Sequence, residues 1–271
     1  MYMTLLPVLL FLLLICICNS YDRLTPAGPL SPDDKLISND GIFAFGFFSP
    51  RNSTAKSYVG IWYHNIPVRT YVWVANRDNP ITSSSPGKLV LTNGSDLVLS
   101  DSEGHTFWTT TNNITAGGVH TAVILLNSGN LVIRLPNGTD IWQSFLHPTD
   151  TMLSDMSLPL SKSTSMHLVA WRGPDDPSSS DYSLGGDSGL QYFVWNGTRP
   201  YWRRAAVNGI TDYAMYQSND LSMSQNIVNR GGEFYFTYTV YAGSPVRMML
   251  NYTGMVELLT WNSNSSSWEG W

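Results

Sequence analysis

The sequence predicts an all-β protein in which small sheets are arranged around shared axes. Past residue 20, apolar or alternating runs of four to eight residues are separated by clusters of Gly, Asn, Asp, Ser and Pro. Such runs, rich here in branched and aromatic residues, are typical of strands joined by turns. No stretch of this part has the apolar period of an amphipathic helix, and a unit of sequence recurs after 34 residues.

Residues 1–20 are expected to be a secretory signal peptide that precedes the folded chain. Residues 5–17 form a nearly continuous apolar run, and residues 18–20 (CNS) suit a signal-peptidase site. A membrane anchor is the alternative, but the run is shorter than the roughly 20 residues that span a bilayer. Both cysteines, Cys16 and Cys18, lie in this segment. The mature chain would therefore be free of disulfides, and either secreted or held at the extracellular face of the plasma membrane.

Strands are expected in order along the rest of the chain, and no βαβ unit is expected. In the first half the candidates are residues 42–48, 58–63, 71–75, 88–91, 96–99, 122–126 and 130–135. In the second half they are residues 190–195, 233–241, 247–252 and 255–261. Short strands at regular spacing with turns between them indicate an all-β architecture.

An internal repeat refines this architecture. Residues 89–108 align without a gap on residues 123–142, with six of twenty positions identical, and a more divergent copy ends in Trp73. A repeat of this length can also be helical, but these units carry period-two alternation and turn residues instead. Three sheets closing around one axis would bring Trp73, Trp108 and Trp142 together as core tryptophans.

Ordered motifs extend from residue 46 to residue 203. They are residues 46–50 (GFFSP), 60–63 (GIWY), 72–80 (VWVANRDNP), 128–132 (SGNLV), 142–145 (WQSF), 147–151 (HPTDT), 175–178 (DDPS), 193–197 (FVWNG) and 199–203 (RPYWR). The earlier motifs resemble the bulb-type lectin domain of plant S-domain (G-type lectin) receptor-like serine/threonine kinases and S-locus glycoproteins. The later ones resemble the S-locus glycoprotein domain that follows it in that family.

The resemblance implies a signal peptide at residues 1–20, a bulb-type lectin domain at residues 21–151 and an S-locus glycoprotein domain at residues 152–271. The implied folds are a pseudo-threefold β-prism II and a second β-prism-like domain. The implied function is extracellular recognition of a peptide, a glycan or a partner receptor, in pollen recognition, self-incompatibility or defence, with homodimers or heterodimers as further partners. The alternatives are an N-terminal fragment of a membrane receptor kinase and a soluble mannose-binding lectin.

The sugar-binding signal of the fold is degenerate in this chain. Mannose-binding lectins of this fold use the pattern Q-x-D-x-N-x-V-x-Y once per sheet. Only Asn130 keeps its polar place intact, and Asp96 occupies the Asn place of the second copy. Each lost hydrogen bond forfeits about 1 kcal/mol or more. The aligned residues are Thr92, Gly94, Asp96, Val98 and Ser100 in the second copy, Leu126, Ser128, Asn130, Val132 and Arg134 in the third, and Gly60, Trp62 and His64 in the first. We therefore expect recognition through other surfaces.

Glycosylation acceptors are dense, and charges are sparse. Charged residues make up 13% of the chain and the net charge is −5, which argues against a nucleic-acid partner. A surface solubilised by sugar would account for the low charge. The N-x-S/T acceptors are Asn52, Asn93, Asn113, Asn137, Asn196, Asn251 and Asn264.

No catalytic, metal or cofactor site is expected. Residues 186–190 (GDSGL) resemble the surroundings of a protease serine, but no matching His segment or disulfide framework accompanies them. The five histidines lie singly, without ligand spacing. Residues 76–80 (NRDNP) are interpreted as a turn in which Arg77 pairs with a nearby acid.

Overall fold

The computed structural model is built almost entirely of strands. It describes residues 22–51, 55–82, 86–111, 121–161, 166–187, 191–203, 214–217 and 221–270. Within these ranges the only helix is the short 3₁₀ turn η1 (Ser144–Leu146), and no helix there is long and apolar enough to cross a membrane. The prediction of an all-β chain is confirmed.

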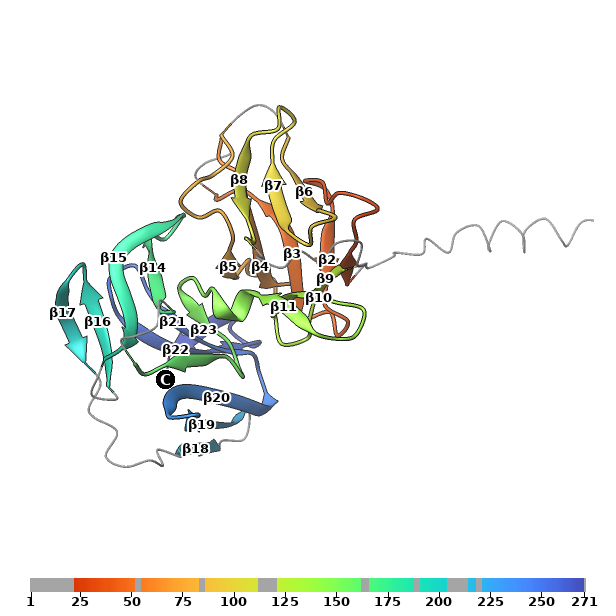
Figure 1. Cartoon of the computed structure of the whole chain (residues 1–271). Helices are drawn as coiled ribbons and strands as arrows, with labels where there is room; N and C mark the ends of the chain where they lie inside the picture. The colour runs from red at the N-terminus through yellow and green to blue at the C-terminus, as the bar shows by residue number, and fades with distance from the viewer. Residues whose placement is uncertain are drawn as a thin grey trace, which may run out of the picture.

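The first half of the chain forms three antiparallel sheets, one for each copy of the repeat (Figure 1). The first contains β2 (Lys35–Ile37), β3 (Phe43–Phe48), β4 (Tyr58–Tyr63) and β5 (Tyr71–Val74). The second contains β6 (Lys88–Leu91), β7 (Leu97–Ser100) and β8 (Thr106–Thr109). The third contains β1 (Arg23–Leu24), β9 (Ala122–Leu125), β10 (Leu131–Arg134) and β11 (Asp140–Gln143).

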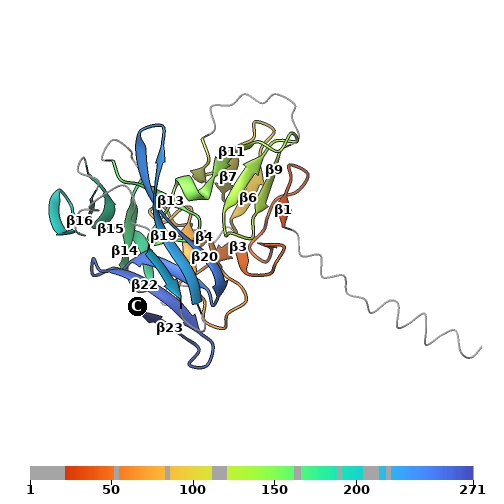
Figure 2. The ribbon, with the colours of Figure 1, turned by 90° about the horizontal axis from the view of Figure 1, so that it is seen from below.

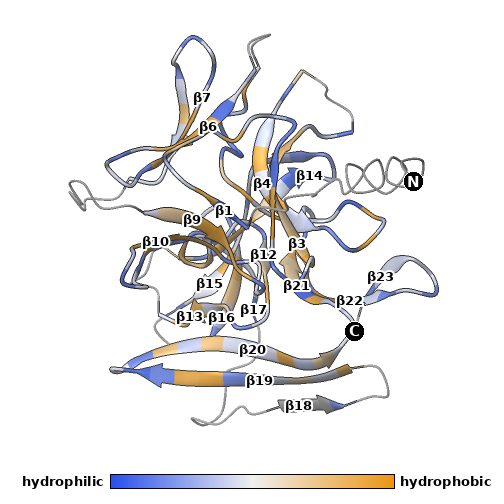
Figure 3. Ribbon diagram, turned by 90° about the vertical axis from the view of Figure 1, so that its right-hand side faces the viewer, coloured by the Kyte–Doolittle hydropathy of each residue, from blue (hydrophilic) through white to orange (hydrophobic). Residues whose placement is uncertain are grey.

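Alternation along the strands builds the core of this half. In β6, Leu89 and Leu91 are buried, whereas Lys88 is exposed, as expected for a sheet with one face inward. The N-terminal segment then ties two sheets together, because β1 pairs with β9 and Leu30 forms an isolated bridge with Leu89. Apolar residues are concentrated along β9 and β10 (Figure 3).

The second half forms three further antiparallel sheets of four strands each. The first contains β12 (Thr151–Met152), β21 (Val246–Leu250), β22 (Val256–Asn262) and β23 (Ser267–Gly270). The second contains β13 (Ser157–Pro159), β20 (Glu233–Gly243), β19 (Leu221–Arg230) and β18 (Ala214–Gln217). The third contains β14 (Leu168–Gly173), β15 (Asp176–Gly186), β16 (Tyr192–Asn196) and β17 (Arg199–Arg203). Figure 2 shows β22 and β23 beside the long β19 and β20. The second half thus repeats the three-sheet plan, starting one residue before the expected second domain.

The two halves share one hydrophobic core. Tyr63 of β4 donates a hydrogen bond from its hydroxyl to the Val246 carbonyl at 3.3 Å, and Trp268 of β23 donates from its indole to Thr70 Oγ1 at 2.9 Å. Gly129 has a φ of +82° and lies so close to Leu153 that a Cβ would approach its side chain to 2.7 Å. Only glycine suits this turn, on both backbone and steric grounds.

Arg77 links the halves in a way that differs from the sequence prediction. It is buried in the turn after β5, where it donates to the carbonyls of Pro177 (2.8 Å), Val169 (2.9 Å) and Ala170 (2.8 Å). The prediction that Arg77 pairs with an acid is wrong, because the guanidinium donates its hydrogen bonds to main-chain oxygens of β14 and β15. Burial lowers its pKa, and Asp150 opposes that shift from a distance.

The other side chains of this turn also bind separate elements. Asn76 accepts a hydrogen bond from the Val59 amide at 2.9 Å. Asp78 accepts from the Ser179 amide at 2.6 Å and the Ser179 hydroxyl at 2.7 Å. The segment predicted to be a structural turn is therefore a clamp that joins β4 in the first half to β15 in the second.

Candidate functional site

Asn130, the intact residue of the sugar pattern, is used within the fold. It lies immediately before β10 and is 6% exposed. Its amide donates to Gln143 Oε1 at 3.0 Å, and its carbonyl oxygen accepts from the Ser144 hydroxyl and the Phe145 amide, each at 3.2 Å. These bonds join β10 to the end of β11, so both ends of the side-chain amide are already engaged.

Two further positions of the third copy, Val132 and Arg134, are also engaged within the fold. Val132 is fully buried. Arg134, at the tyrosine place, forms a bidentate pair with Asp140 at 2.6 and 3.1 Å, and hydrogen bonding to Asp140 raises the pKa of Arg134. This copy therefore offers packing and an ion pair where a mannose site needs converging free donors and acceptors.

The second copy builds a tight hairpin around Asp96. The Asp96 amide donates to Thr92 Oγ1 at 3.1 Å, and its carbonyl accepts from the Thr92 amide at 2.8 Å. Ser95 between them is buried and has a φ of +68°. Thr92, Ser95 and Asp96 therefore form the turn of this hairpin.

The first copy is filled by an aromatic side chain. Trp62 is 4% exposed, and the Arg69 guanidinium lies 4.5 Å from its ring centroid. A large ring therefore stands at the place where the pattern has a small apolar residue.

The three repeat tryptophans meet at the centre of the first half. The ring centroids of Trp73, Trp108 and Trp142 are 5.8–6.0 Å apart, with interplanar angles of 69–76°. Edge-to-face contacts of this kind suit the aromatic quadrupole. Trp73 also donates to the carbonyl of His147 at 2.7 Å, and the His147 ring is stacked on Trp142.

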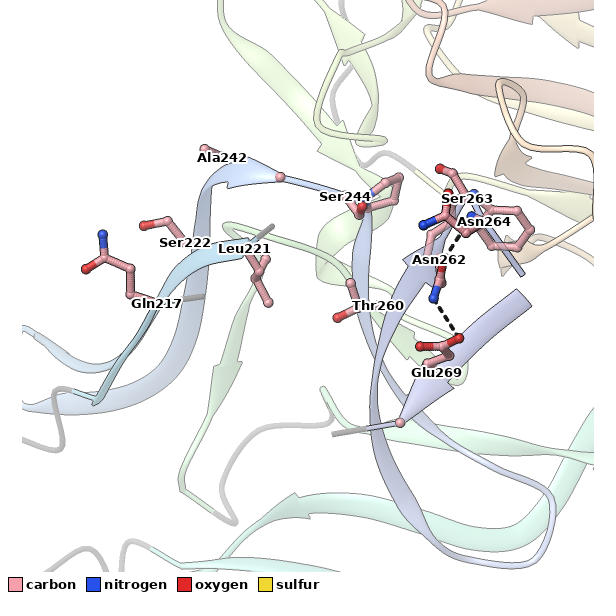
Figure 4. A pocket seen from close by; sticks show the side chains of 14 residues that line it. Gln217, Leu221, Ser222, Ala242, Ser244, Thr260, Asn262, Ser263, Asn264 and Glu269 are labelled. Atoms are coloured by element: carbon pink, nitrogen blue, oxygen red, sulfur yellow. Dashed lines mark hydrogen bonds between the residues drawn. The ribbon is translucent and has the colours of Figure 1, made fainter. Parts of the chain in front are cut away.

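A polar groove of about 920 Å³ opens in the second half. It lies where β18, β19 and β20 come close to β22 and β23. One wall carries Gln217, Leu221 and Ser222, and the other carries Asn262, Asn264 and Glu269 (Figure 4). The remaining lining residues are Ala242, Gly243, Ser244, Pro245, Thr260, Trp261, Ser263 and Gly270.

The chemistry of this polar groove suits a neutral, hydroxyl-rich ligand. Glu269 accepts hydrogen bonds from Asn262 Nδ2 at 2.8 Å and from Ser265 Oγ at 2.9 Å, and these bonds lower the pKa of its carboxyl group. The walls therefore combine amides, hydroxyls and an ionised carboxylate with the apolar surface of Ala242 and Pro245. Such mixtures orient a ligand through a few polar groups beside apolar contacts.

The expected glycosylation acceptors differ in their surroundings. Asn196 and Asn264 are exposed, and Asn264 also lines the polar groove. Asn251 donates to Glu257 Oε2 at 3.0 Å and accepts from the Thr253 amide at 2.9 Å, which shapes the β21–β22 turn. Asn93 and Asn137 lie in the exposed hairpin turns after β6 and β10, whereas Asn52 and Asn113 lie outside the described residues.

One cluster was missed by the sequence analysis. Asp101, Glu103 and His105 alternate in the β7–β8 hairpin, and one potential ligand atom from each lies within 4.8 Å of the others. The signal was the D-x-E-x-H alternation. However, the Asp101 carboxylate already accepts from the amides of Glu103 and His105, each at 2.9 Å, and contacts the His105 ring at 3.0 Å. The hydrogen bonds of the hairpin turn therefore explain why these three side chains lie close together.

Sequence comparisons agree with this architecture. Residues 70–172 match the family model described as D-mannose binding lectin. The S-locus-specific glycoprotein S6 of Brassica oleracea is 35% identical over 276 residues, covering 96% of this chain and 62% of that protein. The receptor-like serine/threonine-protein kinase SD1-7 of Arabidopsis thaliana is 35% identical over 248 residues, covering 89% of this chain and 29% of the kinase. Over most of its length the chain is therefore homologous to S-locus glycoproteins and G-type lectin S-receptor-like kinases.

The chain spans less than two thirds of the length of either relative. Among solved structures, a monomeric monocot mannose-binding lectin from Gastrodia elata is 20% identical, with a TM-score of 0.35, covering 45% of this chain and 96% of the lectin. The sequence relatives confirm the predicted resemblance, and the antiparallel sheets of both halves confirm the predicted all-β fold class.

Proposed function

We propose that this chain is an extracellular recognition module that binds carbohydrate in the polar groove. The observation that carries the proposal is the groove itself, where Gln217 and Ser222 line one side and Asn262 and Glu269 line the other side of a space of about 920 Å³. Sugar hydroxyls need such pairs of donors and acceptors beside apolar surface. The relatives' lectin character supports the ligand class, and the internally engaged Asn130 argues against mannose binding in the pattern positions.

The location and processing of the chain belong to the same proposal. Residues 1–20 would act as the signal peptide, and the exposed acceptors would carry N-linked glycans outside the cell. Residues 21–151 and 152–271 would be the two lectin-like domains. The chain would act by binding alone, without a catalytic step, whether it is displayed by itself or ahead of a kinase domain.

The test is an oligosaccharide titration of protein produced without N-linked glycans, so that the chain's own sugars do not compete. We expect binding on a glycan array, weakened about fivefold or more by Gln217→Ala, since a lost hydrogen bond costs about 1 kcal/mol or more. Lys88→Ala, on the exposed face of β6, is the control. Absence of array binding, or binding that Gln217→Ala leaves unchanged, would refute the proposed site.

A second candidate function is docking of a protein partner on the edge strand β17. Tyr201 and Trp202 are 52% and 47% exposed there, between Arg199 and Arg203. Exposed aromatic and arginine side chains are enriched at protein interfaces. Tyr201→Ala and Trp202→Ala in the secreted ectodomain should then abolish capture of a partner ectodomain in a pull-down while leaving carbohydrate binding intact. Capture that survives both substitutions would exclude this surface.

A further inference from the structure

We propose that the N-linked glycan on Asn264 lies in the polar groove and is its resident ligand in the glycosylated protein. This inference rests on the proposed function, because it assumes that the groove binds carbohydrate. It adds the identity of the occupant: a sugar chain attached to the protein's own wall, rather than a free ligand.

The first argument is position. Asn264 and its acceptor residue Ser266 are exposed in the turn between β22 and β23, and Asn264 is itself a lining residue of the groove. The turn is fixed, because Asn262 Oδ1 accepts from the amides of Asn264 at 2.9 Å and Ser265 at 3.3 Å. A sugar attached at Asn264 therefore begins its path at the groove wall.

The second argument is chemical fit. The first sugars of an N-linked glycan present hydroxyls and N-acetyl groups, which need hydrogen-bond partners and a small apolar surface. The wall across the groove from Asn264 contains the exposed Gln217 and the partly exposed Ser222 (Figure 4), and the exposed Ala242 adds apolar lining. The volume of about 920 Å³ lies within the range of roughly 300–1,000 Å³ typical of ligand sites.

The third argument is attachment. A short flexible tether gives the attached group a local concentration in the millimolar range, so a groove with only weak affinity would still be occupied by its own glycan. Asn196 provides the comparison within the chain. It and its acceptor Thr198 are equally exposed, in the β16–β17 turn, but they do not line this groove.

Native endoglycosidase digestion of the protein bearing high-mannose glycans tests the inference. Release at each acceptor is followed by mass spectrometry of peptides. If the glycan spends about nine-tenths of its time bound, its release from Asn264 should be about tenfold slower than from Asn196. After denaturation the two rates should agree. Equal rates in the native protein would overturn the inference.

Gln217→Ala is the matched groove variant, because Gln217 is on the wall opposite the attachment point. It should bring the release rate at Asn264 toward that at Asn196 and leave Asn196 unchanged. A release rate at Asn264 that remains slow in Gln217→Ala would show that the turn, and not the groove, protects the glycan, and would likewise overturn the inference.

Binding of added chitobiose and high-mannose oligosaccharide separates this inference from the proposed function. We expect the glycosylated protein to bind them weakly and Asn264→Gln, which removes the attachment, to bind them well, with Asn196→Gln behaving as the glycosylated parent. Equal binding by the parent and Asn264→Gln would refute the resident glycan while the groove remained a carbohydrate site. No binding by either protein, with unprotected Asn264, would refute both.

Discussion

At the scale of single residues, Asn130 shows that a position of the mannose pattern has a structural role in this chain. Asn130 keeps the identity that a mannose site requires, yet its hydrogen bonds go to Gln143, Ser144 and Phe145. A residue's identity in a pattern therefore does not establish its role. What decides is whether its polar atoms are directed to solvent or to the chain's own main chain and neighbouring side chains.

Asn130→Ala should reduce stability rather than recognition. Removing the amide leaves buried donors without partners, and we expect the free energy of unfolding to fall by about 2–4 kcal/mol. Urea denaturation measures it, with Lys88→Ala on the exposed face of β6 as the control. Carbohydrate binding by the folded variant should equal that of the parent. Parental stability combined with lost binding would instead make Asn130 a sugar ligand.

His105 should titrate at a higher pH than His64 and His147. Its hydrogen bond to Asp101 raises its pKa, whereas burial lowers the pKa of His147 and, together with Lys35 and Arg69, that of His64. Ring-proton NMR should therefore give the order His105 above His64 and His147, and Asp101→Asn should lower the His105 midpoint. A His105 midpoint at or below that of His147 would contradict this assignment.

The sign of the pH effect on the β7–β8 hairpin follows from these shifts. Because the pKa of folded His105 is raised, its contact with Asp101 contributes fully below pH 6.5, the ordinary value, and is lost as the pH rises through the raised one. Burial alone would raise the Asp101 pKa, but hydrogen bonds from His105 and Glu103 lower it. The stability contributed by these hydrogen bonds to the Asp101 carboxylate is present above pH 3.8 and is lost as the pH falls through the lowered pKa.

At the scale of elements, the repeat predicts the core tryptophans correctly because each of the three sheets places one tryptophan at the same axis. All three lie in the last strand of their sheets, but Trp73 is 6% and Trp142 8% exposed, whereas Trp108 is partly exposed. The three positions are therefore equivalent in pattern but unequal in burial, and Trp73 alone donates to the His147 carbonyl.

Replacing these tryptophans by phenylalanine should reveal that inequality. Trp73→Phe removes packed ring volume and a hydrogen bond, and should lower the free energy of unfolding by about 3 kcal/mol. Trp108→Phe, at the more exposed position, should cost about 1 kcal/mol. Denaturant unfolding of the pair measures the difference. Equal costs would mean that the rings share one environment.

Sequence patterns located the strands that are clear apolar runs and missed those fixed by tertiary pairing. The expected strands of the first half all form, with ends shifted by a residue or so, because each is an apolar run between turns. Burial alternates along β6, β7 and β9 and is nearly continuous along β3 and β4. Residues 176–186 (DPSSSDYSLGG) show no such pattern, yet they form β15, since β14 and β16 supply hydrogen-bond partners on both edges. Pairing with neighbours here overrides local propensity.

The polar groove was beyond local sequence patterns for a related reason. Its walls come from Gln217, Leu221 and Ser222 and from residues 242–245, 260–264 and 269–270, and only the fold brings these segments together. Arg77 illustrates the other limit. The prediction of an acidic partner for Arg77 is wrong because carbonyl acceptors are available at every residue, and no sequence pattern distinguishes them from a carboxylate.

At the scale of the whole molecule, two three-sheet halves are joined by directional bonds as well as by apolar contact. The guanidinium of Arg77 alone binds three carbonyls of the second half, and Asp78 binds Ser179 beside them. This clamp fixes the half that carries the polar groove against the half that carries the repeat.

Arg77→Lys should weaken that connection although the charge is kept. A lysine cannot reproduce the planar set of donors, and losing two charge-assisted hydrogen bonds should cost about 3–5 kcal/mol. We expect urea unfolding to separate into two steps, with Arg23→Lys, at an exposed position of β1, as the control. A single transition with parental midpoint would show that apolar packing alone couples the halves.

The central claim is that carbohydrate recognition resides in the polar groove and not in the mannose-pattern positions. The most direct measurement is an NMR titration of isotope-labelled protein lacking N-linked glycans with chitobiose and a high-mannose oligosaccharide. The account predicts amide shifts at Gln217, Ser222, Asn262 and Glu269. Shifts confined to the hairpins around Asp96 and Asn130, or no shifts at all, would contradict it.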